Sequence, residues 1–310
     1  MDFSRRNILA GLGLAALSSV ASGAQPEDRA GTRLVLLGTA GGPRPRRTRS
    51  GSAQAIVVNG EIYVIDCGDG VARQMVLAGL PLRRLRHILI THHHSDHNLD
   101  FGALVQLAWM SGLVSRVDCW GPPPTRRMVG RYLDYQAEDI GVRTTDEGRV
   151  PLKPLIHAHD LRGAGLVMED ENVRVTAAKV DHPPLDLALA YRFDAADRSI
   201  VISGDTRESS SLVRLAQGAD VLVHEVMLAE RVHAMLSVLP NGDSLARSVI
   251  AHHTTAEQVG RVAAAAGVKQ LVLSHFVPAE DPTVPDEEWI APARRHFSGP
   301  IVVGRDLMEI

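Results

Sequence analysis

Thr91-His92-His93-His94-Ser95-Asp96-His97 is the most informative segment of the sequence, and it directly follows the apolar run His87-Ile88-Leu89-Ile90. Crowded imidazoles beside a carboxylate are costly to bury unless they have partners. His92 and His94 leave an extended segment on the same side, so both can reach one ion. The acid and the last histidine follow as the chain turns, and they can serve a second ion. A solvated turn or an affinity tag is the alternative, but a tag is a terminal homopolymer without an interleaved acid. The segment therefore predicts a metal site, since zinc prefers such nitrogen and oxygen ligands.

More residues with metal-binding or catalytic chemistry stand at the ends of strand-like runs further along the chain. They are Asp66 in Val64-Ile65-Asp66-Cys67-Gly68-Asp69-Gly70, His182 in Val180-Asp181-His182-Pro183-Pro184, Asp205 in Ser203-Gly204-Asp205-Thr206, and His275 in Leu273-Ser274-His275-Phe276. Each motif is weak alone. Their order and the strand before each one make a chance arrangement a poor explanation.

Taken in order, these motifs resemble the signature of the metallo-β-lactamase superfamily over nearly all of the chain after residue 31. Two further motifs, His224-Glu225 and His253-Thr254-Thr255, are similar to those that mark its ribonuclease Z-like branch. The resemblance implies an α/β fold, an αββα sandwich formed by a single domain over residues 25–310. Its ligands would lie on loops at one edge of the sheets, where a rigid scaffold can bring distant residues together.

The resemblance also implies a role for each site residue. The ligands of two Zn²⁺ or similar divalent ions would be His92, His94 and His182 for one ion, Asp96, His97 and His275 for the other, and Asp205 for both. A hydroxide that bridges the ions would attack the substrate, and Asp66 would orient a ligand from behind. Asp96, Glu225 and His253 would be the catalytic residues, with Glu225 holding His253 as the acid for the leaving group. The alternative is that Glu225 caps a helix and His253 lies on the surface, and the adjacent His252 leaves the assignment open.

Composition indicates a folded globular protein. The chain has 310 residues, of which 45% are hydrophobic and 22% charged, which is enough for a sizeable core. A net charge of −3 argues against a general nucleic-acid binder. Arginines crowd one loop after the first expected strand, however, and the resemblance implies that this loop lies near the metal site. We therefore expect Arg46, Arg47 and Arg49 to bind an anionic substrate. The alternative is a solvated basic loop.

The first 24 residues are typical of a twin-arginine signal peptide. Ser4-Arg5-Arg6-Asn7-Ile8-Leu9 precedes an apolar stretch and the small residues Ala21-Ser22-Gly23-Ala24. The mature protein would then be periplasmic or secreted, with no stable membrane insertion after cleavage; the alternative is an uncleaved anchor. Cys67 and Cys119 are expected to be buried small hydrophobes without a disulfide. A homodimer is expected from family analogy alone.

Strand-like and helix-like runs alternate in two halves of the chain. The expected strands are residues 33–37, 53–58, 61–65, 87–90 and 117–120, then 173–177, 188–193, 199–202, 220–223, 270–273 and 300–303. The expected helices are residues 70–80, 99–111, 209–217 and 255–266. Residues 121–160 are the least readable part, with a helix from Pro122 through Asp139. His157 and His159 alternate like ligands, but no carboxylate follows them, so we expect surface or pocket histidines.

The sequence favours a small anionic ester, such as an aryl sulfate or a phosphodiester, as the substrate. RNA-cleaving members of the branch usually carry a protruding arm after the strand that follows the third histidine, and here only residues 194–198 stand at that place. Export would also separate the protein from RNA precursors. The alternative function is 3′ processing of transfer RNA, with nucleic acid as the partner. A lactonase or thioesterase, or a metal-binding protein without catalysis, is a further alternative.

Overall fold

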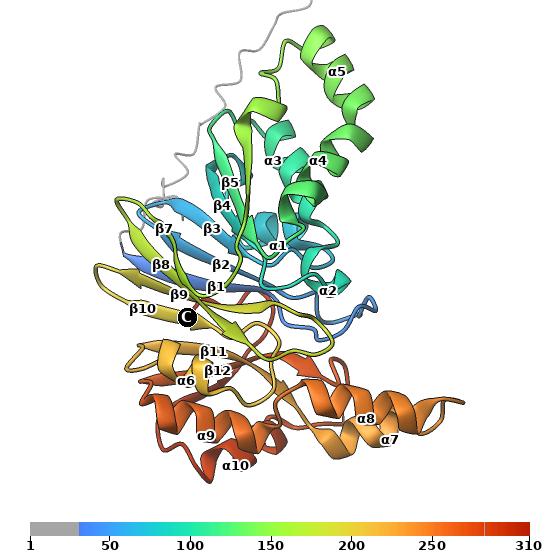
Figure 1. Ribbon diagram of the computed structural model, residues 1–310, viewed down its shortest axis with the longest axis vertical. Helices are drawn as coiled ribbons and strands as arrows, with labels where there is room; N and C mark the ends of the chain where they lie inside the picture. Colours follow the sequence, from blue (N-terminus) through green and yellow to red (C-terminus); the bar gives the residue numbers. More distant parts are fainter. Residues whose placement is uncertain (1–30, 282) are drawn as a thin grey trace, which may run out of the picture.

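Two sheets pack face to face, and helices cover the outer face of each (Figure 1). The computed structural model describes residues 31–281 and 283–310. The predicted αββα sandwich is confirmed. The predicted signal peptide over residues 1–24 lies outside the described residues, so that boundary and the predicted export stay predictions. Among the described residues, no helix combines the length and apolarity needed to cross a membrane.

The first sheet contains six strands in chain order. They are β1 (Thr32–Gly38), β2 (Ala53–Val58), β3 (Glu61–Ile65), β4 (Leu85–Leu89), β5 (Val117–Gly121) and β6 (Ile156–Asp160). The first three form an antiparallel meander, and β3 to β6 run parallel. Parallel neighbours need crossover connections, and these carry α1 (Val71–Leu77), η2 (Leu82–Arg84), α2 (Ser95–Asn98), α3 (Phe101–Met110), α4 (Thr125–Tyr135), α5 (Ala137–Asp146) and η3 (Lys153–Leu155).

The second sheet has seven strands in the order β13-β12-β11-β10-β9-β8-β7. They are β7 (Gly165–Glu169), β8 (Val173–Val180), β9 (Ala188–Ala195), β10 (Ser199–Ile202), β11 (Val221–Met227), β12 (Gln270–Val277) and β13 (Ile301–Val303). The helices α6 (Ser210–Leu215), α9 (Ala256–Ala266) and α10 (Asp286–Arg294) lie on its outer face. The pair α7 (Ala229–Leu236) and α8 (Gly242–His252) projects to one side, as Figure 1 shows in orange.

The core lies in three layers, and strand β1 shows why. Leu34 and Leu36 pack between the two sheets, whereas Val35 and Leu37 pack against the helices of the first half. Both faces of the strand are therefore buried, which explains its continuous apolar sequence. The free thiols of Cys67 and Cys119 are fully buried in the helix-side layer, as predicted.

Several predicted boundaries were wrong. The helix expected from Pro122 through Asp139 is two helices, α4 and α5, which meet at Gln136. The strands β6 and β7 and the helices α7 and α8 were not predicted. The strands β11 and β12 extend further than expected, so Glu225 and His275 lie inside strands and not after them.

Two glycines let the loop before α1 lie directly on the segment that carries the clustered histidines. A Cβ atom on Gly68 would lie 2.4 Å from the carbonyl carbon of Gly51 and 2.5 Å from the backbone oxygen of Asp96. Backbone hydrogen bonds join the same loops, from Cys67 N to His97 O and from Gly68 N to Ser52 O. The position of the clustered histidines thus depends on a glycine at residue 68.

We expect Gly68→Ala to destabilise the protein by about 1–3 kcal/mol, because the facing backbone atoms cannot move without shifting the segment before β2 or the helix α2. The matched control is Gly130→Ala in α4, where an added Cβ meets nothing within 4 Å. That change should be neutral or stabilising by up to about 1 kcal/mol. Denaturant unfolding measures both variants, and equal stability of the two would contradict the close approach.

Candidate metal centre and active site

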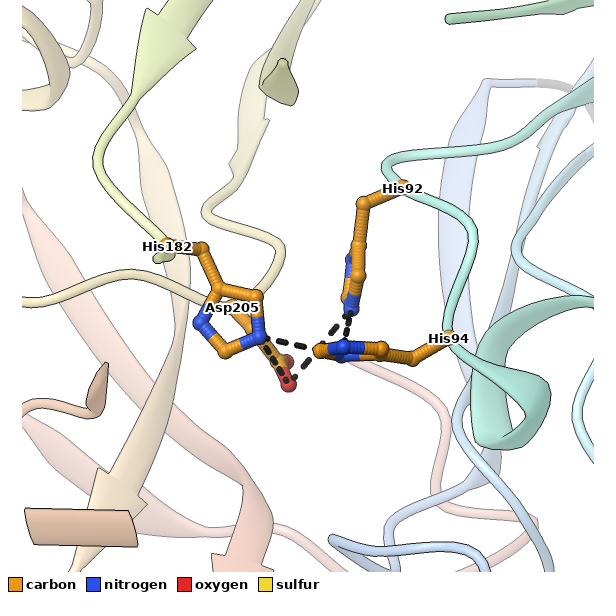
Figure 2. A group of neighbouring side chains, drawn as sticks. All are labelled: His92, His94, His182 and Asp205. Carbon is orange, nitrogen blue, oxygen red and sulfur yellow. Dashed lines mark hydrogen bonds and ion pairs between the residues drawn. The ribbon is translucent and has the colours of Figure 1, made fainter. Parts of the chain in front are cut away.

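Three histidines and an aspartate from three separate segments form a first cluster of donor atoms (Figure 2). His94 Nδ1 lies 3.1 Å from His92 Nε2 and 3.1 Å from His182 Nε2. Asp205 Oδ2 lies 3.8 Å from the first of these Nε2 atoms and 3.9 Å from the second. Donors around a tetrahedral ion at roughly 2.0–2.1 Å are roughly 3.3 Å apart. The cluster therefore has the spacing of a ligand set.

A second cluster shares Asp205 and adds the remaining predicted ligands. Asp205 Oδ1 lies 3.3 Å from His97 Nε2 and 3.2 Å from His275 Nε2. Asp96 Oδ2 lies 3.4 Å from the same nitrogen of His275 and also accepts a hydrogen bond from Gly42 N at 2.9 Å. The two oxygens of Asp205 thus face different clusters.

The carboxylates of these clusters need compensating positive charge. Asp66, Asp96 and Asp205 are all buried around His97, and buried carboxylates need compensating positive charge. Asp205 Oδ1 makes no hydrogen bond with any described residue. Both donor sets therefore fit divalent ions, which would supply the missing partner and the missing charge.

Hydrogen bonds behind the histidines turn their Nε2 atoms toward the centre. Asp66 Oδ2 lies 2.7 Å from His97 Nδ1, and the backbone oxygen of His252 lies 3.0 Å from His182 Nδ1. Thr91 Oγ1 lies 3.0 Å from His92 Nδ1 and is itself bonded to Asp66. Such partners fix the tautomer and the ring orientation of a ligand. Asp66 has the contacts that its predicted role requires.

Burial also sets the protonation of the first cluster. Desolvation lowers the pKa of His182 to about 4. Desolvation and the neighbouring imidazole of His97 hold the pKa of His92 well below its ordinary value. Both rings are therefore neutral at physiological pH, and the neutral imidazole is the form that binds a metal.

Glu225 and His253 form a hydrogen-bonded pair beside the donor atoms. Glu225 Oε2 lies 2.8 Å from His253 Nδ1, and Oε1 accepts a hydrogen bond from Thr206 N at 2.6 Å. Burial lowers the pKa of His253, but the facing Glu225 carboxylate outweighs burial and raises that pKa to about 9. Glu225 lies in β11 and caps no helix, and His253 is mostly buried. The structure therefore has the paired arrangement, and not a helix-capping Glu225 with His253 on the surface.

The other histidines lie apart from the donor clusters. His93 Nε2 lies 2.8 Å from the backbone oxygen of Pro122, so this ring points away from its neighbours in sequence. His159 stacks on Trp120 and bonds to Asp118, and His157 bonds to the backbone oxygen of Pro154. His252 contributes its backbone oxygen through the contact with His182.

The three predicted substrate arginines have different surroundings. Arg49 donates to Thr39 Oγ1 and to the backbone oxygen of Gly304, and its guanidinium lies 4.1 Å from the centre of the Phe276 ring. The guanidinium of Arg49 is therefore occupied by contacts within the protein. Arg47 is exposed, outside the cavity at the donor atoms. Only Arg46 of the three lines that cavity.

The cavity at the donor atoms has a volume of about 410 Å³. One wall is apolar and comes from α7, α8 and the end of β12, and this wall was missed in the sequence. A helical spacing was there to be read, because Val232, Met235 and Leu236 recur at i, i+3 and i+4.

Comparison with known proteins agrees with this geometry. Residues 62–276 match the family described as the Beta-lactamase superfamily domain. Ribonuclease Z of Mycobacterium bovis (strain BCG / Pasteur 1173P2) is 31% identical over 280 residues, which cover 89% of this chain and 97% of that protein. Ribonuclease Z of Mycobacterium sp. (strain KMS) is 32% identical over 281 residues, with 89% and 95% covered.

Solved structures share the fold at lower identity. The metallo-beta-lactamase fold protein YhfI from Bacillus subtilis superposes with a TM-score of 0.68 at 18% identity, covering 90% of this chain and 98% of that chain. The short form of human tRNase Z gives a TM-score of 0.64 at 22% identity, again with 90% and 98% covered. The chain belongs to the metallo-β-lactamase superfamily, in its ribonuclease Z-like branch. It is thus a metal-dependent hydrolase of that superfamily.

The prediction of a small anionic ester, such as an aryl sulfate, as the substrate is wrong, because relatives that match this chain over nearly their full length carry the name Ribonuclease Z. The short β9–β10 connection is real, but the match spans 97% of the Mycobacterium bovis protein. That relative therefore has no long arm that this chain lacks. The net charge of −3 was also a poor guide, since it averages over the whole chain while arginines gather at the site. The argument against nucleic acid as a partner fails with these two points.

We expect Asp205→Asn to lose most of its bound divalent metal, because both donor clusters share that carboxylate. The matched control is Asp243→Asn, an exposed acid on α8. Elemental analysis of the purified proteins measures the bound metal, and circular dichroism checks that the variants are folded. Full metal content in Asp205→Asn would contradict the shared-ligand arrangement.

Proposed function

We propose that this protein is an endoribonuclease of the ribonuclease Z type, which cuts a phosphodiester bond at the 3′ side of transfer RNA precursors. The observation that carries the proposal is an identity of 31–32%, over 89% of this chain, to proteins named Ribonuclease Z. The fold shared with the short form of human tRNase Z is compatible with it. The predicted export does not enter this proposal and stays a prediction.

The proposed cofactors are two divalent ions, zinc or a similar metal. His92, His94 and His182 would hold one ion, and Asp96, His97 and His275 the other. When bound, the ions would lower the pKa of a water to about 7 and stabilise negative charge on the phosphoryl oxygens. Asp205 would hold both ions at a fixed separation, since its two oxygens face different clusters.

His253 supplies the proton for the leaving oxygen. With its Nδ1 engaged by Glu225, the free Nε2 is the nitrogen that can donate to a substrate. A pKa raised to about 9 keeps this imidazole protonated at neutral pH. Glu225 is held in turn by Thr206 N, so the acid is fixed from behind by a chain of hydrogen bonds.

The test is cleavage of a precursor transfer RNA that carries a 3′ trailer and a label at its 5′ end. The metal-loaded protein should release the trailer, a chelator should abolish cleavage, and added zinc should restore it. Mature transfer RNA and the Asp205→Asn variant are the controls. Turnover of an aryl sulfate or a lactone with no cleavage of the RNA would overturn the proposal.

The role of His253 predicts a dependence on the leaving group. His253→Ala should slow RNA cleavage by about 10²–10⁴-fold. The same variant should slow the hydrolysis of bis(4-nitrophenyl) phosphate far less, because a nitrophenolate can leave without being protonated. The matched control is the adjacent His252→Ala, which keeps its backbone contact with His182. Equal losses on both substrates in kcat measurements would count against His253 as the acid.

A further inference from the structure

The cavity beside the donor atoms has two unlike walls. Val232 and Met235 of α7 and Val249 of α8 form part of an apolar wall. Across the cavity lies the loop that carries Arg44 and Arg46. Asp96, Asp205 and His275 of the donor clusters reach the same space, so a group held here lies next to the reacting atoms.

We propose that this cavity is a nucleoside subsite, which binds the base of the nucleotide on the leaving-group side of the scissile phosphodiester. The inference rests on the proposed function and adds the part of the substrate that this protein grips. A volume of about 410 Å³ suits a group of that size.

The position of His253 assigns the cavity to the leaving-group side. His253 lines the cavity and directly follows α8, which supplies part of the apolar wall. The oxygen that His253 protonates therefore belongs to the nucleotide nearest that wall.

The chemistry of the wall suits a base held by its faces. Aliphatic side chains and the thioether of Met235 pack against a flat ring but offer no strong hydrogen-bond donor or acceptor to its edge. Apolar packing on the ring face is non-directional, so it does not distinguish one base from another. The subsite should therefore accept all four bases, within roughly a few-fold of one another.

The loop wall suits the charge of a nucleotide. Arg46 Nε is buried, and it makes no hydrogen bond with any described residue. Arg44 lies beside it, while Glu280 is the acid close to it. A guanidinium in this state can bind a backbone phosphate of the same RNA strand. The apolar wall and the arginines together match a base with its phosphate.

The test uses two modified RNA substrates, each with an abasic ribose on one side of the scissile bond. Of the two products, the one that carries a hydroxyl group and no phosphate at the cut contains the leaving-side nucleotide. For the wild-type protein, removal of the leaving-side base should lower kcat/KM by about 10-fold or more. Removal of the base on the other side should have a smaller effect.

The paired variant is Met235→Ser with Val249→Ser, two wall residues that are not fully buried. Its kcat/KM on intact RNA should fall by a similar factor relative to the wild-type protein. On the leaving-side abasic RNA, its kcat/KM should equal that of the wild-type protein. The matched control is Val238→Ser, which is 82% exposed near the tip of the same helix pair and lies outside the cavity. Metal content should be unchanged in both proteins, and thermal unfolding checks that both are folded at the assay temperature.

Each outcome has one meaning. If the wild-type protein cuts intact and abasic RNA equally well, the subsite is overturned while the proposed function stands. If the wall variant loses the same factor on both substrates, the wall acts only on the fold, and the subsite is again overturned. If the wild-type protein cuts no RNA at all, the proposed function fails, and the subsite falls with it.

Arg46 gives an independent readout. Arg46→Ala should weaken the salt dependence of KM for RNA, because each lost phosphate contact lowers that slope. Arg174→Ala is the control, since that exposed arginine pairs with Glu169 on β7, away from the cavity. An unchanged slope in Arg46→Ala would overturn the phosphate contact.

Discussion

The arrangement of the whole molecule depends on three buried carboxylates gathered around one histidine. Asp66, Asp96 and Asp205 surround His97 at distances between 2.7 and 3.7 Å. Without compensating cations, such a cluster is costly to bury. The ligand positions lie within or just after strands of both sheets, so the charges that require cations also link the two halves of the sandwich. Positive φ angles of 61° at Asp66 and 45° at His275 show that the backbone is strained to aim these side chains.

The residues of both donor clusters can be picked out from the sequence because they stand in short, specific motifs. Seven residues that could bind metal stand in short motifs after apolar runs, and the structure brings all seven into two clusters. The sheets are also predictable where strands are buried on both faces, as in β1. The helical spacing of α7 is in the sequence, but the cavity that its apolar residues face is not predictable, because other elements complete it. Arg46 and Arg49 differ only in what surrounds them in space, which no local pattern records.

The prediction of the substrate was wrong because it depended on the absence of a long arm and on the net charge of the whole chain. A short β9–β10 turn says nothing about an RNA substrate when relatives of nearly equal length carry the name Ribonuclease Z. A net charge of −3 does not describe a loop where Arg44 and Arg46 meet the site. Binding of a polyanion depends on the local field near the reacting atoms, which clefts focus. Local charge and surface shape are therefore better guides to the substrate than totals over the chain.

In the proposed function, the helix pair α7 and α8 would connect substrate binding with catalysis. The backbone of His252 at the end of α8 holds His182, and the next residue is His253, which Glu225 orients. A base that packs on Val249 and Met235 therefore presses on the same element that positions a ligand and the acid. Binding energy from a remote part of a substrate can serve the reacting centre in this way. A substrate without that base should then lose kcat as well as affinity, whereas a passive pocket would change affinity alone.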